Sequence, residues 1–322
     1  MKKTILLTPL LLAALLLAGC VAAPPDALMR QDSAASREKL ISADAAQLPM
    51  RSGLYTLYFR YGDTPYLAQE ERMLTIERNT PVELAVVRAL LDGPAATASA
   101  LTPLFPPGTE ALAVSMQGGT LFVTFNEALL GKYADETGDL QSEYRQKEII
   151  LRRRLCMDAL TATLTEAGLC TSVQALVYRE KVQDKSMRLS DGFYTLKDDG
   201  APLDPLTRSE SSLLTPHNAE QLLLSEWMSR DFPAFYGLVA RQDAPDEAAA
   251  LETLESAPVL TGFSLSAGNV SPDGQSVVLT ADLSLRDGDT DLTATGYPLR
   301  MIREDGIWKI TYAQAIALMN QE

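Results

Sequence analysis

The chain has 322 residues, of which 46% are hydrophobic and 22% are charged. This composition excludes wholesale disorder, and the length predicts two globular domains. The formal net charge is −14, which argues against a nucleic-acid partner. With three cysteines and a single histidine, the chain cannot assemble a Cys/His zinc site, so no metal is expected. It also lacks GxGxxG, Walker A and GxSxG patterns, so no cofactor is expected and most enzyme classes are disfavoured.

Residues 1–19 have the pattern of a secretory signal peptide. Two lysines at positions 2 and 3 precede a short apolar run, Ile5–Leu17. Thirteen helical residues span about 20 Å, less than a hydrocarbon core of about 30 Å, so we expect this segment to be removed. The motif LAGC at residues 17–20 resembles the lipobox of bacterial lipoproteins. The resemblance implies a diacylglyceryl group on Cys20 and an extracytoplasmic chain anchored to the membrane by lipid.

Residues 20–51 are predicted to be the lipidated cysteine and a flexible tether. The segment is rich in Ala, Ser, Asp and Pro and has few large apolar groups. A flexible chain of thirty residues has a root-mean-square reach of about 30 Å, so it would keep the folded part near the membrane. Removal of residues 1–19 removes two lysines and no acids and brings the charge to −16. A polybasic membrane patch is therefore absent.

Residues 52–197 are predicted to form the first domain, of the α+β class, with the order β-α-β-β-α-β and its helices on one face of a sheet. The first helix is expected to begin with Thr80 as N-cap, Pro81 at the first helical position and Glu83 in a capping box. A hairpin is expected around Gly118 and Gly119. The expected elements are the strand Leu54–Phe59, the helix Pro81–Leu91, the strands 110–116 and 120–126, the helix Gln146–Ala167 and the strand Val173–Tyr178.

Short segments of this region carry a family resemblance. In chain order they are LYF at 57–59, ALL at 89–91 with GP at 93–94, PGT at 107–109, the alternating run 119–125, LTATLTE at 160–166 and VQ at 173–174. This series resembles the GerM (GerMN) domain of sporulation and spore germination, although residues 157–160 are less apolar than is typical there. The resemblance implies an extracytoplasmic anchored protein, related to ring-building modules, that carries no known catalytic residue. It also implies an envelope protein partner, or self-association, through a sheet edge or a helix face of this domain.

Residues 198–211 are polar and rich in turn-forming residues, and they are predicted to link the first domain to a second one, residues 212–322. A helix opening at Thr215 and Pro216 is expected to bury Leu222, Leu223, Trp227 and Met228, and an acidic helix covers Pro245–Leu254. The remainder is strand-like. Asp-Gly pairs at 273–274, 287–288 and 305–306 separate the alternating runs Ser276–Leu285, Leu292–Arg303 and Ile307–Tyr312, which predicts an antiparallel meander.

Helices followed by a curved meander that ends in GIWKI at 306–310 resemble the nuclear transport factor 2-like fold. That fold encloses a pocket, so the resemblance implies a site for a small apolar ligand. Core packing is the alternative for the same aromatic side chains. The candidate lining is Trp227, Phe232, Phe235, Tyr236 and Phe263.

Other candidate residues have structural interpretations. His217 lies in the first turn of a helix without an accompanying Ser or Cys motif, so we expect it to be solvated. Cys156 lies about 16 Å before the end of its helix and Cys170 just beyond that end, which predicts free thiols because a disulfide requires Cα atoms within about 7 Å. The residues Asp287, Asp289 and Asp291 lack the glycine and glutamate of a calcium loop. The triplet 152–154 of arginines is expected on a solvated helix face.

These observations favour a lipid-anchored envelope protein that binds or scaffolds rather than catalyses. The rival hypothesis is an envelope glycan hydrolase with two carboxyl groups about 5–10 Å apart, drawn from the 42 acidic residues. No pair of acids stands out in the sequence. Binding of a small ligand by residues 212–322 is a third hypothesis.

Overall fold

The computed structural model describes residues 50–136, 142–180, 185–195 and 200–320. The chain divides into two compact units, Met1–Arg51 and Ser52–Glu322. The signal peptide at 1–19, Cys20 and nearly all of the tether at 20–51 lie outside the described residues. None of the helices in the described ranges is both long enough and apolar enough to span a bilayer. The fold described here is that of the second unit.

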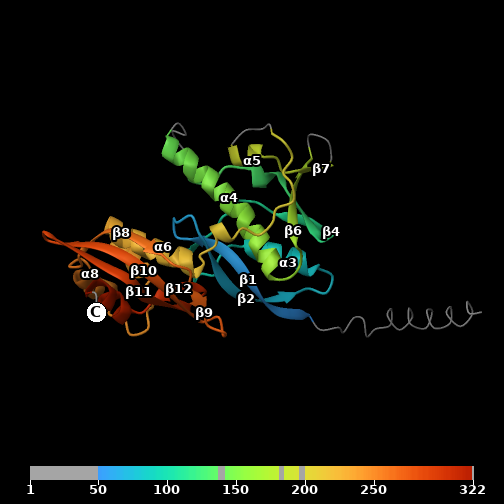
Figure 1. Cartoon of the computed structure of the whole chain (residues 1–322). Coiled ribbons are helices and arrows are strands. Elements are labelled where there is room, and N and C mark those ends of the chain that lie inside the picture. The colour runs from blue at the N-terminus through green and yellow to red at the C-terminus, as the bar shows by residue number, and fades with distance from the viewer. Residues whose placement is uncertain (1–49, 137–141, 181–184, 196–199, 321–322) are drawn as a thin grey trace, which may run out of the picture. The chain divides into compact units, whose positions relative to one another are not determined.

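The first half of this unit contains two sheets and two principal helices (Figure 1). In chain order the elements are β1 (Arg51–Tyr61), β2 (Leu67–Ile76), α3 (Val82–Leu91), β3 (Leu101–Thr102), β4 (Ala111–Gln117), β5 (Thr120–Phe125), the 3-10 helix η2 (Glu127–Leu130), α4 (Glu143–Glu166), β6 (Ser172–Arg179), β7 (Lys185–Arg188) and α5 (Gly192–Thr195). The predicted order β-α-β-β-α-β and the α+β class are confirmed. The strands β2, β3 and β7 are additions to it.

One sheet has the order β2-β1-β3 and the other the order β4-β5-β6-β7. In the second sheet β5 pairs with β6 in parallel, with Leu121 opposite Val173 and Phe125 opposite Val177. A parallel pair needs a long crossover, which α4 supplies. The sequence did not predict β2, because its central residues QEERMLT are mostly polar and alternate between exposed and half-buried positions.

The start of α3 differs from the prediction. Pro81 itself is the N-cap, with an extended backbone, and no side chain caps the helix. Thr80 precedes the N-cap residue, so it cannot form the predicted capping box. Its backbone nitrogen instead donates to the carbonyl of Glu77 at 3.0 Å in the preceding turn. The end of the helix is as predicted, since Gly93 adopts a left-handed conformation with φ +83°.

The long helix α4 buries a broad face that includes Ile149, Cys156, Leu160 and Leu164. The prediction that the whole arginine triplet faces solvent was wrong. Arg154 is exposed and Arg152 is half-buried, but Arg153 is only 5% exposed. Its position three residues before Cys156 places it on the buried face of the helix.

The second half begins with the 3-10 helix η3 (Glu210–Ser212) and continues with α6 (Pro216–Ser229), α7 (Phe232–Gly237), α8 (Glu247–Leu254), β8 (Val259–Leu265), β9 (Asn269–Val270), β10 (Ser276–Asp287), β11 (Thr290–Glu304), β12 (Ile307–Ile310) and α9 (Tyr312–Asn320). Thr215 caps α6 by accepting a hydrogen bond from the Asn218 backbone at 3.2 Å, as predicted. The sheet has the order β12-β11-β10-β8, and β9 also pairs with β10.

Two expectations for this half were wrong. Met228 is 45% exposed, because it lies beside the buried Trp227 on the helix but points away from the sheet. Tyr312 does not extend the last strand but begins α9, whose buried residues Ala315, Leu318 and Met319 follow helical spacing.

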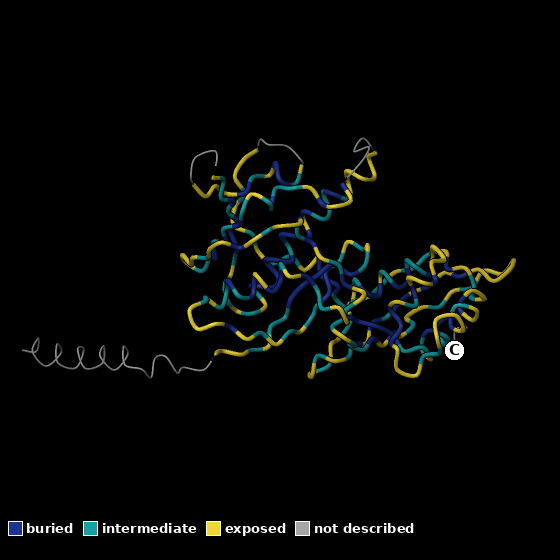
Figure 2. The backbone as a smooth tube through the Cα atoms, turned by 180° about the vertical axis from the view of Figure 1, so that it is seen from behind, coloured by how far each residue is buried: buried dark blue, intermediate teal, exposed yellow. Residues whose placement is uncertain are grey.

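Buried side chains of both halves belong to one continuous apolar cluster. Leu67 of β2 and Leu213 form an isolated parallel bridge, and the Leu214 backbone donates to the carbonyl of Leu67 at 2.8 Å. Figure 2 shows the buried stretches running through both halves, with exposed residues concentrated at turns and strand ends. The contact between β2 and the second half positions the cleft described next.

Candidate functional site

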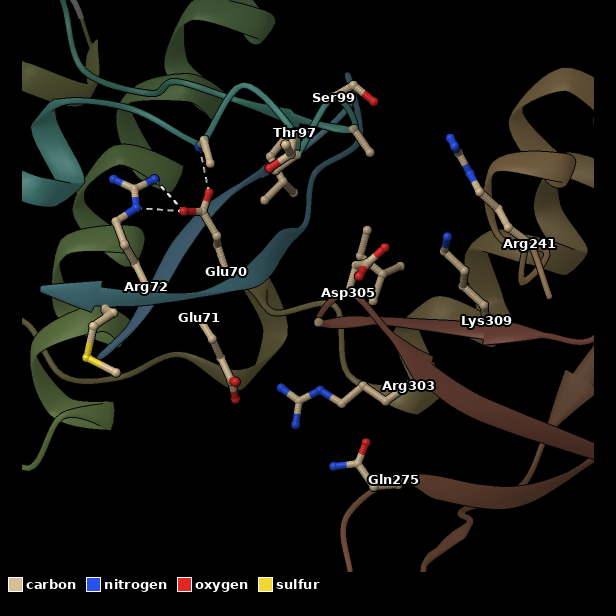
Figure 3. Close-up of a pocket in the computed structure, with 17 residues that line it drawn as sticks. Glu70, Glu71, Arg72, Thr97, Ser99, Arg241, Gln275, Arg303, Asp305 and Lys309 are labelled. Atoms are coloured by element: carbon tan, nitrogen blue, oxygen red, sulfur yellow. Dashed lines mark hydrogen bonds and ion pairs between the residues drawn. The ribbon is translucent and has the colours of Figure 1, made fainter. Parts of the chain in front are cut away.

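A polar cleft of about 690 Å³ lies where β2 and the loop after α3 face the β11–β12 hairpin (Figure 3). One wall consists of residues 70–73 of β2 and 95–101 of the loop. The other wall is formed by the side chains of Arg241, Gln275, Arg303, Asp305 and Lys309, with Gly306 and Ile307 between them. The cleft has the size of a small-molecule site.

The close approach of the two walls depends on the Asp305-Gly306 turn. Both residues have positive φ, +51° and +78°, which closes the tight hairpin between β11 and β12. A Cβ atom at position 306 would overlap the backbone carbonyl of Gln69 in β2. Only glycine therefore allows the hairpin to pack against this strand.

The β2 wall is held by a network around Arg72. Its Nε donates to Glu70 at 2.7 Å, and its other nitrogens donate to the carbonyls of Ala89 at 3.0 Å and Gly93 at 2.9 Å. Glu70 also accepts from the backbone nitrogen of Ala95 at 2.8 Å. These bonds fix the start of the loop 95–101, which presents small side chains and the hydroxyl groups of Thr97 and Ser99 to the cleft.

The opposite wall carries cations arranged around Glu304. This carboxylate accepts from Lys309 Nζ at 2.8 Å and from the backbone nitrogen of Arg241 at 3.0 Å. Burial opposes its ionisation, but these hydrogen bonds outweigh burial and hold the pKa of Glu304 below its ordinary value. Figure 3 shows the side chains of Arg241 and Lys309 extending from this wall into the cleft.

Two guanidinium groups at the cleft have no carboxylate partner. Among the residues that the structure describes, no ion pair is formed by Arg241 or Arg303. The Arg303 guanidinium lies 5.9 Å from the ring centroid of Trp308, which orients it without neutralising it. In Figure 3 it points across the opening toward Glu71. The cleft can therefore supply both positive charge and hydrogen-bond acceptors to a ligand.

A second, smaller cavity of about 280 Å³ lies against α4. Three of its charged groups are paired with one another: Arg152 donates to both oxygens of Asp135 at 2.7 Å and to Glu148 at 3.0 Å. Glu148 also pairs with the buried Arg60. The ion pairs account for these charged residues as structural contacts within the protein.

The comparisons with known proteins concern the first half of the unit. Residues 56–180 match the family model "Germane: Sporulation and spore germination". This segment is a GerM-type domain. The match agrees with the resemblance drawn from the short segments between residues 57 and 174. It ends before α6 and does not include the C-terminal half.

Two solved structures of GerM from Bacillus subtilis are similar to the chain. The tandem GerMN domains have 16% identity and a TM-score of 0.32, and the alignment covers 49% of this chain and 45% of that one. The first GerMN domain alone has 13% identity and a TM-score of 0.31, with coverage of 48% and 98%. The chain thus spans less than half of the tandem structure. A comparison with the curated proteins finds no match.

The predicted aromatic pocket residues lie outside the GerM-type domain and pack in the core. Trp227, Phe232 and Phe235 are at most 2% exposed, while Tyr236 and Phe263 are half-buried against them. Trp227 Nε1 donates to the carbonyl of Pro258 at 3.0 Å. Neither cavity described above is lined by any of the five. A ligand role for them stays a prediction.

The cysteines that the structure describes are free. Cys156 is buried in α4, where burial raises the pKa of its thiol well above the ordinary value, and Cys170 is half-buried. His217 is exposed in the first turn of α6. In the described ranges no cluster of Cys, His, Asp and Glu has the arrangement of a metal site, and Asp291 is paired with Arg286 at 2.9 Å.

Sequence reasoning missed the cleft. Its lining residues come from five separate segments, and each segment looks like an ordinary solvated turn or strand. One signal could have drawn attention to it. Residues 212–322 contain sixteen acidic side chains but only six Lys and Arg side chains, of which three line the cleft: Arg241, Arg303 and Lys309.

Proposed function

We propose that the chain is a lipid-anchored protein of the extracytoplasmic face whose GerM-type domain acts as a non-catalytic binding or scaffolding module in sporulation or spore germination. The match of residues 56–180 to the sporulation and germination family carries this proposal. The LAGC motif at 17–20 supports the anchor. Two acyl chains on Cys20 would hold the protein on the membrane stably, where one chain would bind only marginally.

The exposed edge of β4 is the surface that we assign to partner binding. β4 pairs on one side only, with β5, and its burial pattern is mostly exposed. Leu112 and Met116 on this strand are 42% and 46% exposed. An unpaired strand edge with apolar side chains is suited to adding a strand from another chain or from a second copy.

The non-catalytic part of the proposal is supported by the family description, which names a process and not a reaction. Hydrolysis of a glycan by paired carboxylates would need two available acids facing each other across a groove. Of the three acids that line the cleft, Glu70 is committed to Arg72 and to the backbone of Ala95, which leaves Glu71 and Asp305 as the pair that a hydrolysis assay tests. Purified protein incubated with peptidoglycan should release no fragments, and robust turnover would reject this part.

The anchor is tested by growing cells with an alkyne analogue of palmitate. The wild-type chain should acquire the label, and Cys20→Ser should not. Cys170→Ser is the matched control, because it removes a half-buried thiol and should keep the label. Label that persists in Cys20→Ser would contradict the lipid anchor.

The scaffolding surface is tested with a photo-crosslinking amino acid placed at Met116 on β4 in native membranes. The matched control position is Met228 on α6, which is 45% exposed. We expect a discrete adduct, with another envelope protein or with the chain itself, from position 116 and none from position 228. Equal yields at the two positions, or no adduct at 116, would exclude the β4 edge.

A further inference from the structure

We infer that the cleft between β2 and the β11–β12 hairpin binds an acidic saccharide, a sugar that carries carboxylate or phosphate groups. This inference goes beyond the GerM-type domain, because the three cations on which it rests, Arg241, Arg303 and Lys309, belong to the C-terminal half. The choice of a saccharide rests on the proposed envelope location, where such polymers are exposed to the protein.

The charge distribution is the first reason. The full chain carries a net charge of −14, yet Arg241 from the loop after α7 and Arg303 and Lys309 from the β11–β12 hairpin converge on one cleft. Lys309 is held by Glu304, whereas the Arg241 and Arg303 guanidinium groups form no ion pair among the described residues. Unpaired guanidinium groups in a concave site favour a ligand with carboxylate or phosphate oxygens, which they can bind bidentately.

The positioning of the cations is the second reason. Glu304 accepts hydrogen bonds from the Arg241 backbone and from Lys309 Nζ, so one half-buried carboxylate orders both residues. Figure 3 shows the two side chains extending from the same wall toward the loop that carries Thr97 and Ser99. An acid group of the ligand would lie between Arg241 and Lys309, within reach of these hydroxyl groups.

The remaining lining is suited to hydroxyl groups rather than to large apolar groups. Gln275, Glu71 and Asp305 line the same cleft, and the carboxylates of the last two are able to accept hydrogen bonds from sugar hydroxyl groups. The apolar part of the loop wall is mainly alanine: Ala95, Ala98 and Ala100. The volume of about 690 Å³ exceeds that of a single anion and accommodates a short oligosaccharide.

The test measures binding of defined probes to the full chain, purified in mild detergent, by isothermal titration calorimetry. Trigalacturonic acid supplies the carboxylate saccharide, glucose 6-phosphate the phosphate sugar, and maltotriose a neutral control. We expect at least one acidic probe to bind tenfold or more tightly than maltotriose, with an affinity that falls as salt is raised. The tighter of the two acidic probes identifies the acid group.

Arg241→Gln removes one unpaired cation at an exposed position. It should weaken binding of the acidic probe tenfold or more and leave the unfolding temperature unchanged. Arg286→Gln is the matched control, because it removes the same charge at the exposed β10–β11 turn, where Arg286 pairs with Asp291. It should change the affinity less than twofold.

Three outcomes would overturn the inference: equal binding of acidic and neutral probes, equal effects of the two variants, or tighter binding of a triglutamate peptide than of either acidic sugar. None of them bears on the palmitate labelling or the crosslinking at Met116. Failure of this inference is therefore distinguishable from failure of the proposed function.

Discussion

Arg208 donates a hydrogen bond to the hydroxyl of Tyr58 at 3.0 Å, although 150 residues separate them in the sequence. The Arg208 guanidinium also lies 5.3 Å from the centre of the Tyr58 ring and pairs with Glu166 at 2.7 Å. The same hydroxyl accepts from Gln69 at 2.7 Å. One tyrosine of β1 thus joins β2, the end of α4 and the segment that leads into α6.

Tyr58→Phe should therefore destabilise the protein. The change leaves the ring in place but removes the group that Arg208 and Gln69 share, so we expect the free energy of unfolding to fall by about 1–2 kcal/mol. Urea denaturation measures this loss. Tyr144→Phe is the control, because Tyr144 is 78% exposed, and it should change stability by less than about 0.5 kcal/mol. Equal stability of the wild type and Tyr58→Phe would show that the hydroxyl network contributes nothing net.

The arginine triplet offers an internal comparison. Arg153 is buried, donates to the carbonyl of Gly131 at 3.0 Å and lies 4.9 Å from the centre of the Phe193 ring, with the buried Glu136 at 4.0 Å. Arg153→Ala should lower the free energy of unfolding by about 3 kcal/mol, because it leaves a cavity and an uncompensated buried carboxylate.

The neighbouring Arg154 is exposed, so Arg154→Ala should cost less than about 0.5 kcal/mol. Thermal unfolding of the two variants under one buffer condition measures the difference. Similar losses in both would mean that position 153 is not buried as described.

Glu220 should make stability depend on pH. It is fully buried in α6, both carboxylate oxygens lack a hydrogen-bond partner among the described residues, and burial raises its pKa from 4.5 to about 7. The folded protein therefore holds this proton more tightly than the unfolded chain does. The free energy of unfolding therefore includes a contribution from the protonated carboxyl that is fully present below pH 4.5. This contribution, about 3 kcal/mol, is lost as the pH rises from 4.5 to about 7.

Glu220→Gln removes this titration, so its stability should exceed that of the wild type above pH 7 and the difference should shrink toward pH 4.5. Chemical denaturation at half-unit pH steps measures the two curves. Glu252→Gln, at an exposed position of α8, controls for the loss of one negative charge. A constant offset between wild type and Glu220→Gln across this range would refute the assignment.

The Asp305-Gly306 turn predicts an effect on both stability and the cleft. Gly306→Ala forces a Cβ atom against the Gln69 carbonyl and retains a positive φ of +78°. Gly288→Ala has a similar φ of +56° but open space around it, so it isolates the backbone cost of about 1 kcal/mol. We expect Gly306→Ala to cost at least about 2 kcal/mol more than Gly288→Ala in urea denaturation. Equal costs would show that the hairpin can move away from β2 freely.

Local patterns were sufficient to predict much of the fold. The alternation of β1, β5 and β6, the hairpin at Gly118 and Gly119, and the capping of α6 by Thr215 are each specified within about ten residues. The failures have equally local causes. β2 is a half-exposed edge strand, and its many polar residues do not show the alternation of apolar and polar residues that predicts a strand. α9 begins directly after a strand, without a turn signal between them.

The amino-acid sequence alone determined the succession of most elements and the GerM-type character of residues 56–180, because periodicity, turn residues and short motifs act over neighbouring positions. Only the tertiary structure decided that Arg153 is buried and that Arg241, Arg303 and Lys309 share a cleft with β2. Those placements depend on which distant surfaces pack together, and that packing follows from complementary shapes and burial, which no single segment encodes.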